Sequence, residues 1–332
     1  MSGNNTPETI WYLAYGSNMD PKVFSGRRKI KPLESRVVVA PDYWLSFDIN
    51  GFPYVEPCFA SILKMDRSRF HDIKYAQEIH ARTKYGQDFV WDEKHPQHPL
   101  RSYPPVLQGV AHKITLRDWQ LVIQSEGGWG HDVPTGYNQI QIGCKIMDTD
   151  EQISAHVLEA RPLSVKSHCQ PSARYKNLLT SGAAHHGLDP AYQSYLARVV
   201  PYECVGIRPR MARVIFMAVN TPIIFAFAMM FWRNKGKTPD QMTTPPYWIA
   251  SMFDKASRFS AAVHDCIMEP IFGSGRCSSV EHQIKMREQI ALELKDHSKT
   301  RTEKQKARED EVDKAEGVAL KVVEKTVESA AE

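Results

Sequence analysis

The amino-acid sequence predicts an α+β protein that carries a helical C-terminal extension. In the first part of the 332 residues, segments rich in β-branched and aromatic residues far outnumber the segments typical of helices. From about residue 208 onward the chain becomes helix-prone, first apolar and then densely charged. We therefore expect three parts: a folded domain over residues 1–205, an apolar and amphipathic helical segment over 206–280, and a charged helix grading into a disordered tail over 281–332.

The first expected strand runs directly into a tight polar turn. Residues 10–19 read Ile-Trp-Tyr-Leu-Ala-Tyr-Gly-Ser-Asn-Met. Alternating aromatic and aliphatic residues suit a strand, and Gly16 permits a backbone geometry in which successive N–H groups point at one ligand. Such a nest binds carboxylates or oxyanions. Because Gly-Ser-Asn also ends many strands simply by turning the chain, an ordinary turn is the alternative interpretation.

Further strands are expected over residues 37–49, 58–63, 106–114 and 137–144, which are rich in Val, Ile and aromatic residues. A short helix is expected from Thr115 to about Ile123. Glu126 follows, where this helix gives way to glycines. Between strands, residues 51–57 form either a proline-stiffened loop or part of the rim of a cavity.

A long polar insertion separates two of the expected strands, over about residues 66–105. It is too long for an ordinary strand connection, so a solvated loop or lid is expected. Its four histidines do not follow any standard metal-ligand spacing, and we expect no metal site and no cofactor. These histidines are His71, His80, His95 and His98.

Three segments together resemble the gamma-glutamylcyclotransferase family. They are the Tyr-Gly-Ser-Asn turn after the first strand, Glu126-Gly-Gly at the end of a helix, and the run from Pro171-Ser-Ala-Arg-Tyr175 to a Gly187-Leu188 turn and another helix. Their order and spacing match the family across roughly the first two hundred residues. The likeness is to fungal members with a C-terminal extension. It implies that the strands close into a small mixed β-barrel with flanking helices, and that the turn and Glu126 face one cavity.

The resemblance also implies an enzyme, a lyase-type gamma-glutamylcyclotransferase in residues 1–205. In this reaction the alpha-amine of a gamma-glutamyl amide attacks its own side-chain carbonyl, which releases 5-oxoproline and a free amine. The nucleophile is already tethered, so the enzyme has to supply proton transfer and stabilise charge. The resemblance assigns the role of general acid and base to Glu126. The expected substrate-binding residues are Tyr15, Gly16, Ser17, Asn18, Met19 and Tyr175, although Tyr175 could equally be a hydrogen-bonded core aromatic.

The sequence leaves the substrate open. Asn18 stands where the glutathione-specific branch usually has Leu, so a gamma-glutamyl amino acid is one possibility. Another is the gamma-glutamyl conjugate of a larger thiol compound, as in relatives that serve fungal sulfur-containing secondary metabolism. The alternative to an enzyme is a non-catalytic, membrane-associated binding module that uses the same barrel. A carboxylate at Glu126 favours the enzyme, because a binding module has no need of it.

Residues 214–232 contain no charged residue and are flanked on both sides by Arg and Lys. This length can span a bilayer, and we expect membrane association. Asn220, Thr221 and Pro222 at its centre would kink or break a helix, so a re-entrant turn or a buried helical hairpin is an alternative. Residues 247–267 predict an amphipathic helix with Ile249, Met252 and Phe259 on one apolar face.

Charge and cysteine usage limit the other partners. The net charge is only +4 and the C-terminal charges alternate in sign, so we expect no nucleic-acid binding. The six cysteines show no paired spacing, which indicates a reducing compartment. The first eight residues are polar and resemble no signal peptide. We therefore expect a cytoplasmic catalytic domain that can be anchored to an intracellular membrane; the sequence does not predict an oligomeric state.

Overall fold

The structure is a computed structural model that describes residues 8–83, 103–126, 136–233 and 247–296. Two compact units divide the chain after Ser279. In the second unit, residues 280–296 form a helix on which Lys285 pairs with Glu281, one turn earlier, at 2.8 Å. All other helices and strands described below belong to the first unit.

Five strands form a closed barrel in the order β1-β5-β2-β6-β7. All neighbouring strands are antiparallel except β1 and β7, which are parallel. This confirms the prediction of a small mixed barrel with flanking helices and a helical C-terminal region. The strands are β1 (Thr9–Ala14), β2 (Glu34–Ala40), β5 (Leu107–Thr115), β6 (Tyr137–Ile146) and β7 (Gln152–Ala160).

The strand pairings of the barrel differ in length. The β1–β5, β2–β5 and β6–β7 pairings run along most of each strand. The β1–β7 pairing joins only Trp11 to Ala155 and Tyr12 to His156, and the β2–β6 pairing is equally short. Alternate aliphatic side chains of the strands fill the interior, as period-two patterning requires. Fully buried examples are Leu13, Val38, Val110, Ile114 and Val157.

A separate hairpin of β3 (Tyr43–Phe52) and β4 (Glu56–Lys64) lies outside the barrel sheet. The prediction of one strand over residues 37–49 is therefore wrong. A turn at Pro41-Asp42 divides it, because proline has no N–H for the ladder and Asp favours turns. Strand β7 was not among the predicted strands, since its sequence mixes small, polar and charged residues.

Part of the polar insertion is packed. Helix α1 (Ile73–Thr83) follows a short 3₁₀ turn, Arg67–Arg69. Tyr75 and Ile79 of this helix form a small buried cluster with Trp44 and Tyr103, and the Trp44 and Tyr103 rings stack 5.3 Å apart. The expectation of a solvated loop or lid is thus wrong for residues 73–83, whereas residues 84–102, with His95 and His98, lie outside the described residues.

Three helices flank the barrel, and each begins at a residue that caps it. They are α2 (Leu116–Ser125), α3 (Ala173–His186) and α4 (Pro190–Arg198). The side chains of Thr115, Ser172 and Asp189 accept hydrogen bonds from backbone N–H groups of the first turn. Helix α3 ends at Gly187, whose φ of +68° is the left-handed geometry that glycine adopts freely.

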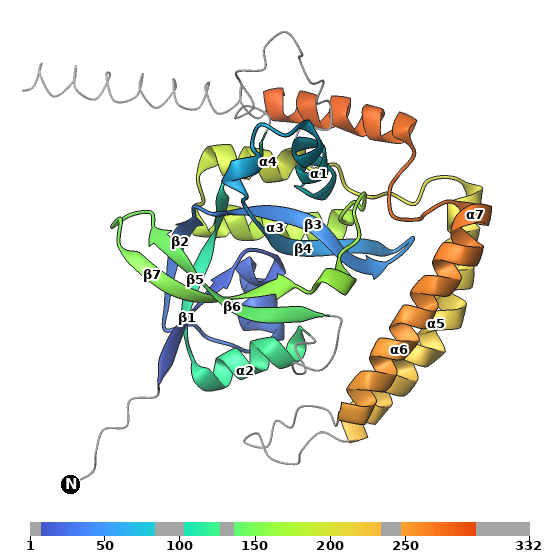
Figure 1. Cartoon of the computed structure of the whole chain (residues 1–332), viewed down its shortest axis with the longest axis horizontal. Coiled ribbons are helices and arrows are strands. Elements are labelled where there is room, and N and C mark those ends of the chain that lie inside the picture. The colour runs from blue at the N-terminus through green and yellow to red at the C-terminus, as the bar shows by residue number, and fades with distance from the viewer. Residues whose placement is uncertain (1–7, 84–102, 127–135, 234–246, 297–332) are drawn as a thin grey trace, which may run out of the picture. The chain divides into compact units, whose positions relative to one another are not determined.

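The C-terminal extension of the first unit is a pair of long helices, α5 (Ile207–Arg233) and α6 (Tyr247–Val263), which lie side by side in Figure 1. Helix α5 continues through Pro222, so the expected break at this point is wrong. The expected helix over 247–267 is present, as α6 and a following π-helical turn, His264–Met268. Its apolar face differs from the prediction, because Met252 and Phe259 are exposed.

Among the described side chains, two contacts join α5 to α6, and a third joins α5 to the turn that follows α6. The Phe227 and Phe253 rings meet edge to face at 5.2 Å. Ser260 donates a hydrogen bond to Asn220 at 2.6 Å. The ring of Phe216 contacts His264 near the base of the pair. We call α5 and α6 together the helical hairpin.

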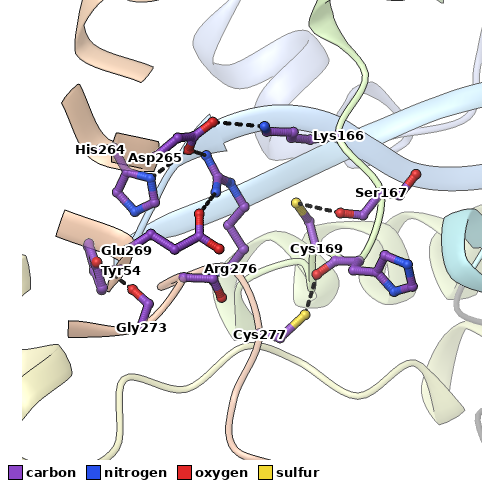
Figure 2. A network of polar contacts seen from close by, with 12 residues as sticks. Tyr54, Lys166, Ser167, Cys169, His264, Asp265, Glu269, Gly273, Arg276 and Cys277 are labelled. Carbon is purple, nitrogen blue, oxygen red and sulfur yellow. Dashed lines mark hydrogen bonds and ion pairs between the residues drawn. The ribbon is translucent and has the colours of Figure 1, made fainter. Parts of the chain in front are cut away.

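Polar contacts fix the base of the helical hairpin to the β3–β4 turn and to residues 166–170 (Figure 2). After the π-helical turn the chain forms the short helix α7 (Glu269–Phe272). Tyr54 donates its hydroxyl to the Gly273 carbonyl at 2.7 Å, and the guanidinium of Arg276 pairs with Asp265 at 2.6 Å and with Glu269 at 3.0 Å. The extension is therefore attached to the barrel domain by specific side chains as well as by the connecting chain.

Candidate active site

A cavity of about 620 Å³ lies between one end of the barrel and the helical hairpin. Its lining includes six of the seven predicted site residues, which come from three separate parts of the sequence. They are Tyr15, Gly16, Ser17, Asn18, Glu126 and Tyr175. The seventh, Met19, is fully buried and is not part of the lining.

Glu126 terminates α2 and turns its carboxylate towards the polar turn that follows β1. Its backbone N–H bonds to the Val122 carbonyl at 3.0 Å, so the last turn of α2 sets its position. The Asn18 side-chain amide donates to Oε1 of Glu126 at 3.0 Å and to the Tyr12 hydroxyl at 2.7 Å. The Glu126 side chain remains 22% exposed. It is therefore both oriented by the protein and accessible from the cavity.

Arg28 is a site residue that the sequence did not predict. Its guanidinium pairs with the Glu126 carboxylate and donates through Nε to Asn18 Oδ1 at 2.7 Å. It also donates to the Ser125 hydroxyl. Arg28 lies in a run of basic residues, Arg27-Arg28-Lys29, which is typical of an ordinary solvent-exposed segment. Its role depends on a contact across 98 positions of sequence, so no local signal could reveal it.

Tyr175 approaches the polar turn at Gly16. Its hydroxyl accepts the N–H of Ala60 at 3.1 Å. Burial raises the pKa of this phenol, although hydrogen bonds from the backbone of Ala60 and Ser17 act in the other direction. Tyr175 therefore is a buried, hydrogen-bonded aromatic and a lining residue of the cavity at once.

The polar turn is a short 3₁₀ helix, Ser17–Met19, in which the Met19 N–H closes back on the Gly16 carbonyl at 3.1 Å. The Met19 N–H is thus used inside the turn. Gly182 of α3 lies directly beneath, and a Cβ added there would be only 2.7 Å from Met19. Helix α3 supports the turn from below through this close approach.

Behind the turn, His112 stacks on Phe24 at 4.5 Å and its Nδ1 bonds to the Ser35 hydroxyl at 2.8 Å. Burial lowers the pKa of His112 to about 3, and the nearby His186 adds to this effect. The imidazole is therefore neutral at neutral pH. Of the two neighbouring histidines at the end of α3, His185 is exposed, whereas His186 is half-buried against His112.

Several buried tyrosines lie close enough to Glu126 to interact with its charge. Burial, first of all, and then the Glu126 charge raise the pKa of Tyr12. Burial likewise raises the pKa of Tyr15 and of Tyr137 well above the usual range. These phenols stay protonated and can donate hydrogen bonds, as Tyr15 does to the Leu158 carbonyl. Among the described residues at this end of the cavity, the carboxylate is the group suited to accept a proton.

The rim of the cavity includes Gly51, Phe52, Pro53 and Glu56 from the β3–β4 connection, so this segment does contribute to a cavity. Glu56 accepts hydrogen bonds from Arg174 and, at 2.5 Å, from the Ser172 hydroxyl. These contacts tie the connection to the start of α3.

The helical hairpin supplies the far wall, which the sequence assigned to a separate part of the chain. Lining side chains from α5 include Phe216, Asn220 and Phe227, and α6 contributes Phe253 and Asp254. The cavity therefore extends beyond residues 1–205.

One group of described side chains could in principle hold a metal ion. His264, Asp265 and Glu269 bring their ligand atoms within 4.8 Å of one another (Figure 2). Arg276, however, pairs with both carboxylates. Burial alone would raise the pKa of Asp265, but hydrogen bonds from Lys166, His264 and Arg276 hold it well below the usual range. A guanidinium already provides the positive charge here, which makes the group a structural ion-pair cluster.

Comparisons with known proteins found relatives by sequence, although no model of a protein family matches the chain. The chain is 28% identical over 272 residues to gamma-glutamyl cyclotransferase gliK of Aspergillus fumigatus, an alignment that covers 80% of this chain and 89% of the relative. It is 26% identical over 273 residues to gamma-glutamyl cyclotransferase aclK of Aspergillus oryzae, with the same coverage of both chains. A solved structure named gamma-glutamyl cyclotransferase aligns with 60% of this chain and 93% of its own, at 17% identity and a TM-score of 0.41.

Proposed function

We propose that the chain, as a member of the gamma-glutamylcyclotransferase family, converts a gamma-glutamyl amide into 5-oxoproline and a free amine, with Glu126 as the general acid and base. The observation that supports this most directly is the position of the Glu126 carboxylate, oriented by Asn18 and Arg28 and open to the cavity. Relatives named as enzymes do not favour the alternative of a non-catalytic binding module.

The reaction balances without an external oxidant, reductant or co-substrate. The alpha-nitrogen of the substrate forms a bond to its own side-chain carbonyl carbon, and the bond from that carbon to the departing nitrogen breaks. Glu126 accepts the proton that the alpha-nitrogen loses and delivers it to the departing amine. Tethering of the nucleophile provides the entropic advantage of an intramolecular reaction.

The polar turn is suited to bind negative charge. We propose that the backbone N–H groups of Gly16 and Asn18 receive the alpha-carboxylate or the tetrahedral oxygen of the substrate. Arg28 pairs with the Glu126 carboxylate and orients it. Tyr175 fixes the shape of the turn through its hydroxyl, which lies close to Gly16.

The direct test is to incubate purified full-length protein with a panel of gamma-glutamyl compounds and to measure 5-oxoproline. Glu126→Gln should lower kcat by at least about 100-fold, because an amide keeps the shape of the side chain but does not accept a proton. Substrate binding should change little, and the variant should stay folded, with a lower melting temperature because the buried Arg28 loses its charged partner.

The matched control is Glu151→Gln, which makes the same change at an exposed position outside the cavity. Its rate should equal that of the unmodified protein. A Glu126→Gln variant that retains more than about a tenth of the rate would refute the assignment.

We also propose that the helical hairpin associates with a membrane. Residues Ile207–Met230 of α5 have a mean hydropathy of 1.7, and most of their side chains are exposed. Large apolar side chains exposed over a whole helix are unusual in a soluble monomer and are typical of an interaction surface. The cyclotransferase reaction itself would take place in the cytoplasm, on a small-molecule gamma-glutamyl substrate.

A further inference from the structure

The cavity is larger than the reacting group of the proposed substrate. At about 620 Å³ it falls in the range of about 300–1,000 Å³ that accommodates drug-sized ligands, whereas a glutamyl group is much smaller. The Glu126 end supplies the polar groups that the glutamyl part needs. The remaining space lies along the helical hairpin and is available to the part of the substrate that leaves.

The two ends of the cavity differ in chemistry. Near Glu126 the lining is polar, with Ser17, Asn18 and Arg28. Along the helical hairpin it includes the Phe227 and Phe253 rings, packed edge to face at 5.2 Å. Ile223 and Ile224 of α5 extend this apolar surface.

Charged groups do not dominate the apolar end. Asp254 of α6 is buried, and Arg258, one turn later, pairs with it at 3.1 Å. Because each charge is matched by the other, this wall presents mainly aromatic and aliphatic surface to a ligand.

We propose that the Phe227–Phe253 wall binds the leaving amine, and that it favours gamma-glutamyl compounds whose leaving amine carries an aromatic or large aliphatic side chain. This inference rests on the proposed cyclotransferase function and adds a specificity determinant from the C-terminal extension. Aromatic rings prefer edge-to-face and offset-stacked neighbours, so a third ring can join the existing pair.

Helix α5 offers a matched control for the wall. Phe227 is 8% exposed and lines the cavity, whereas Phe225, two positions earlier, is 65% exposed and does not line it. Replacing either residue by alanine removes the same ring from the same helix. Only the first replacement changes the wall.

The kinetic experiment compares gamma-glutamylphenylalanine with gamma-glutamylalanine as substrates of the full-length protein. Phe227→Ala should lower kcat/KM for the phenylalanine compound about tenfold, mainly through KM, because small changes in an apolar pocket alter discrimination by about 10-fold or more. The alanine compound should change less than about threefold. Phe227→Leu should fall between, and Phe225→Ala should match the unmodified protein. An equal loss for both substrates in Phe227→Ala would overturn the inference.

A binding experiment separates the wall from the chemistry. In the Glu126→Gln background, calorimetry should show tighter binding of gamma-glutamylphenylalanine than of gamma-glutamylalanine, and Phe227→Ala should abolish the difference. Equal affinities before the Phe227 change would refute the wall. If the affinities differ as expected but the unmodified protein yields no 5-oxoproline, the proposed reaction is refuted. The binding role of the Phe227–Phe253 wall is then still supported.

Discussion

At Gly16 the backbone passes so close to Tyr175 that an added Cβ would lie 2.9 Å from the phenolic oxygen. The φ of −113° at this position is open to other residues, so left-handed geometry is not the reason for the glycine. A methyl group would displace the Tyr175 hydroxyl, which also holds the N–H of Ala60. Because Gly16 has no side chain, the turn can approach Tyr175, which lies 159 positions later in the sequence.

We expect Gly16→Ala to lower kcat/KM by about ten- to hundredfold, because displacement of a site by about 1 Å costs up to 100-fold. Ser17→Ala is the comparison, since Ser17 bonds to the Tyr175 hydroxyl through its backbone N–H, which the substitution keeps. It should cost less than about threefold. Initial rates of 5-oxoproline release measure both, and equal losses would show that proximity to Tyr175 does not matter.

His112 should make stability depend on pH. Its pKa is about 3 in the folded state and 6.5 ordinarily, so between these values the unfolded chain binds a proton that the folded chain does not. Stability is therefore fully present above pH 6.5 and falls as pH drops towards 3. His112→Gln should reduce the slope of unfolding free energy between pH 6 and 5 by about 1 kcal/mol per pH unit.

Urea titrations at several pH values provide the measurement. His185→Gln removes an exposed histidine from α3 and serves as the control. If both variants keep the slope of the unmodified protein, the imidazole of His112 is protonated in the folded state.

Residues that form a recognisable local motif could be proposed for the site from sequence, and the structure brings them to one cavity, whereas a residue that depends on distant contacts could not. The turn at residues 15–18 and Glu126 were identifiable from their own neighbours. Arg28 was not, because only its position opposite Glu126 distinguishes it from other surface arginines.

At the scale of elements, Arg276 fixes the helical hairpin. It is 5% exposed and pairs with Asp265 and Glu269, which precede and begin α7. Removing one partner of a buried ion pair costs about 3–5 kcal/mol, and the partial exposure of both carboxylates reduces this to about 1–3 kcal/mol. We expect Arg276→Met to lower the free energy of unfolding by this amount.

Limited proteolysis should then cut the helical hairpin of Arg276→Met sooner than that of the unmodified protein. Arg208→Met, at an exposed position at the start of α5, is the control for loss of one charge. Unchanged stability in Arg276→Met would mean that apolar contacts such as Tyr54 with Phe216 hold the base of the hairpin by themselves.

Elements were predictable where the periodic pattern was uninterrupted. Strands β1, β5 and β6 and helices α2 and α6 fall close to their expected ranges. Pro222 was expected to interrupt a helix, but α5 continues through it. An exposed helix can leave one carbonyl without an internal partner, bonded to solvent or facing lipid, and still continue. Helix α1 was missed because its apolar residues find partners only in the tertiary fold, at Trp44 and Tyr103.

At the scale of the whole molecule, we expect full-length protein to float with phospholipid vesicles. The outer face of α5 supplies the apolar surface, with Val214 68% exposed and Phe225 65% exposed. Changing both to lysine places two charges on this face, which costs several kcal/mol in a bilayer and should abolish flotation. Turnover should persist, because neither residue lines the cavity.

Leu33→Lys is the control, since Leu33 is equally exposed but lies just before β2. It should float as the unmodified protein does. If the full-length protein stays in the soluble fraction at low and high salt, the helical hairpin does not associate with membranes.

Two strand pairings of the barrel, β1 with β7 and β2 with β6, are short, and we call them the seams. They determine where the barrel can open. Few backbone hydrogen bonds cross between β1 and β7 or between β2 and β6, so opening there costs less than elsewhere and their amides should exchange with solvent earliest. The barrel then consists of two groups of strands that can move relative to each other, β1, β5 and β2 in one group and β6 and β7 in the other. The hydroxyl of Tyr15 reaches across one seam to Leu158, and both residues border the cavity. Opening of these pairings would widen the cavity at this point and give the proposed product, 5-oxoproline, a route out.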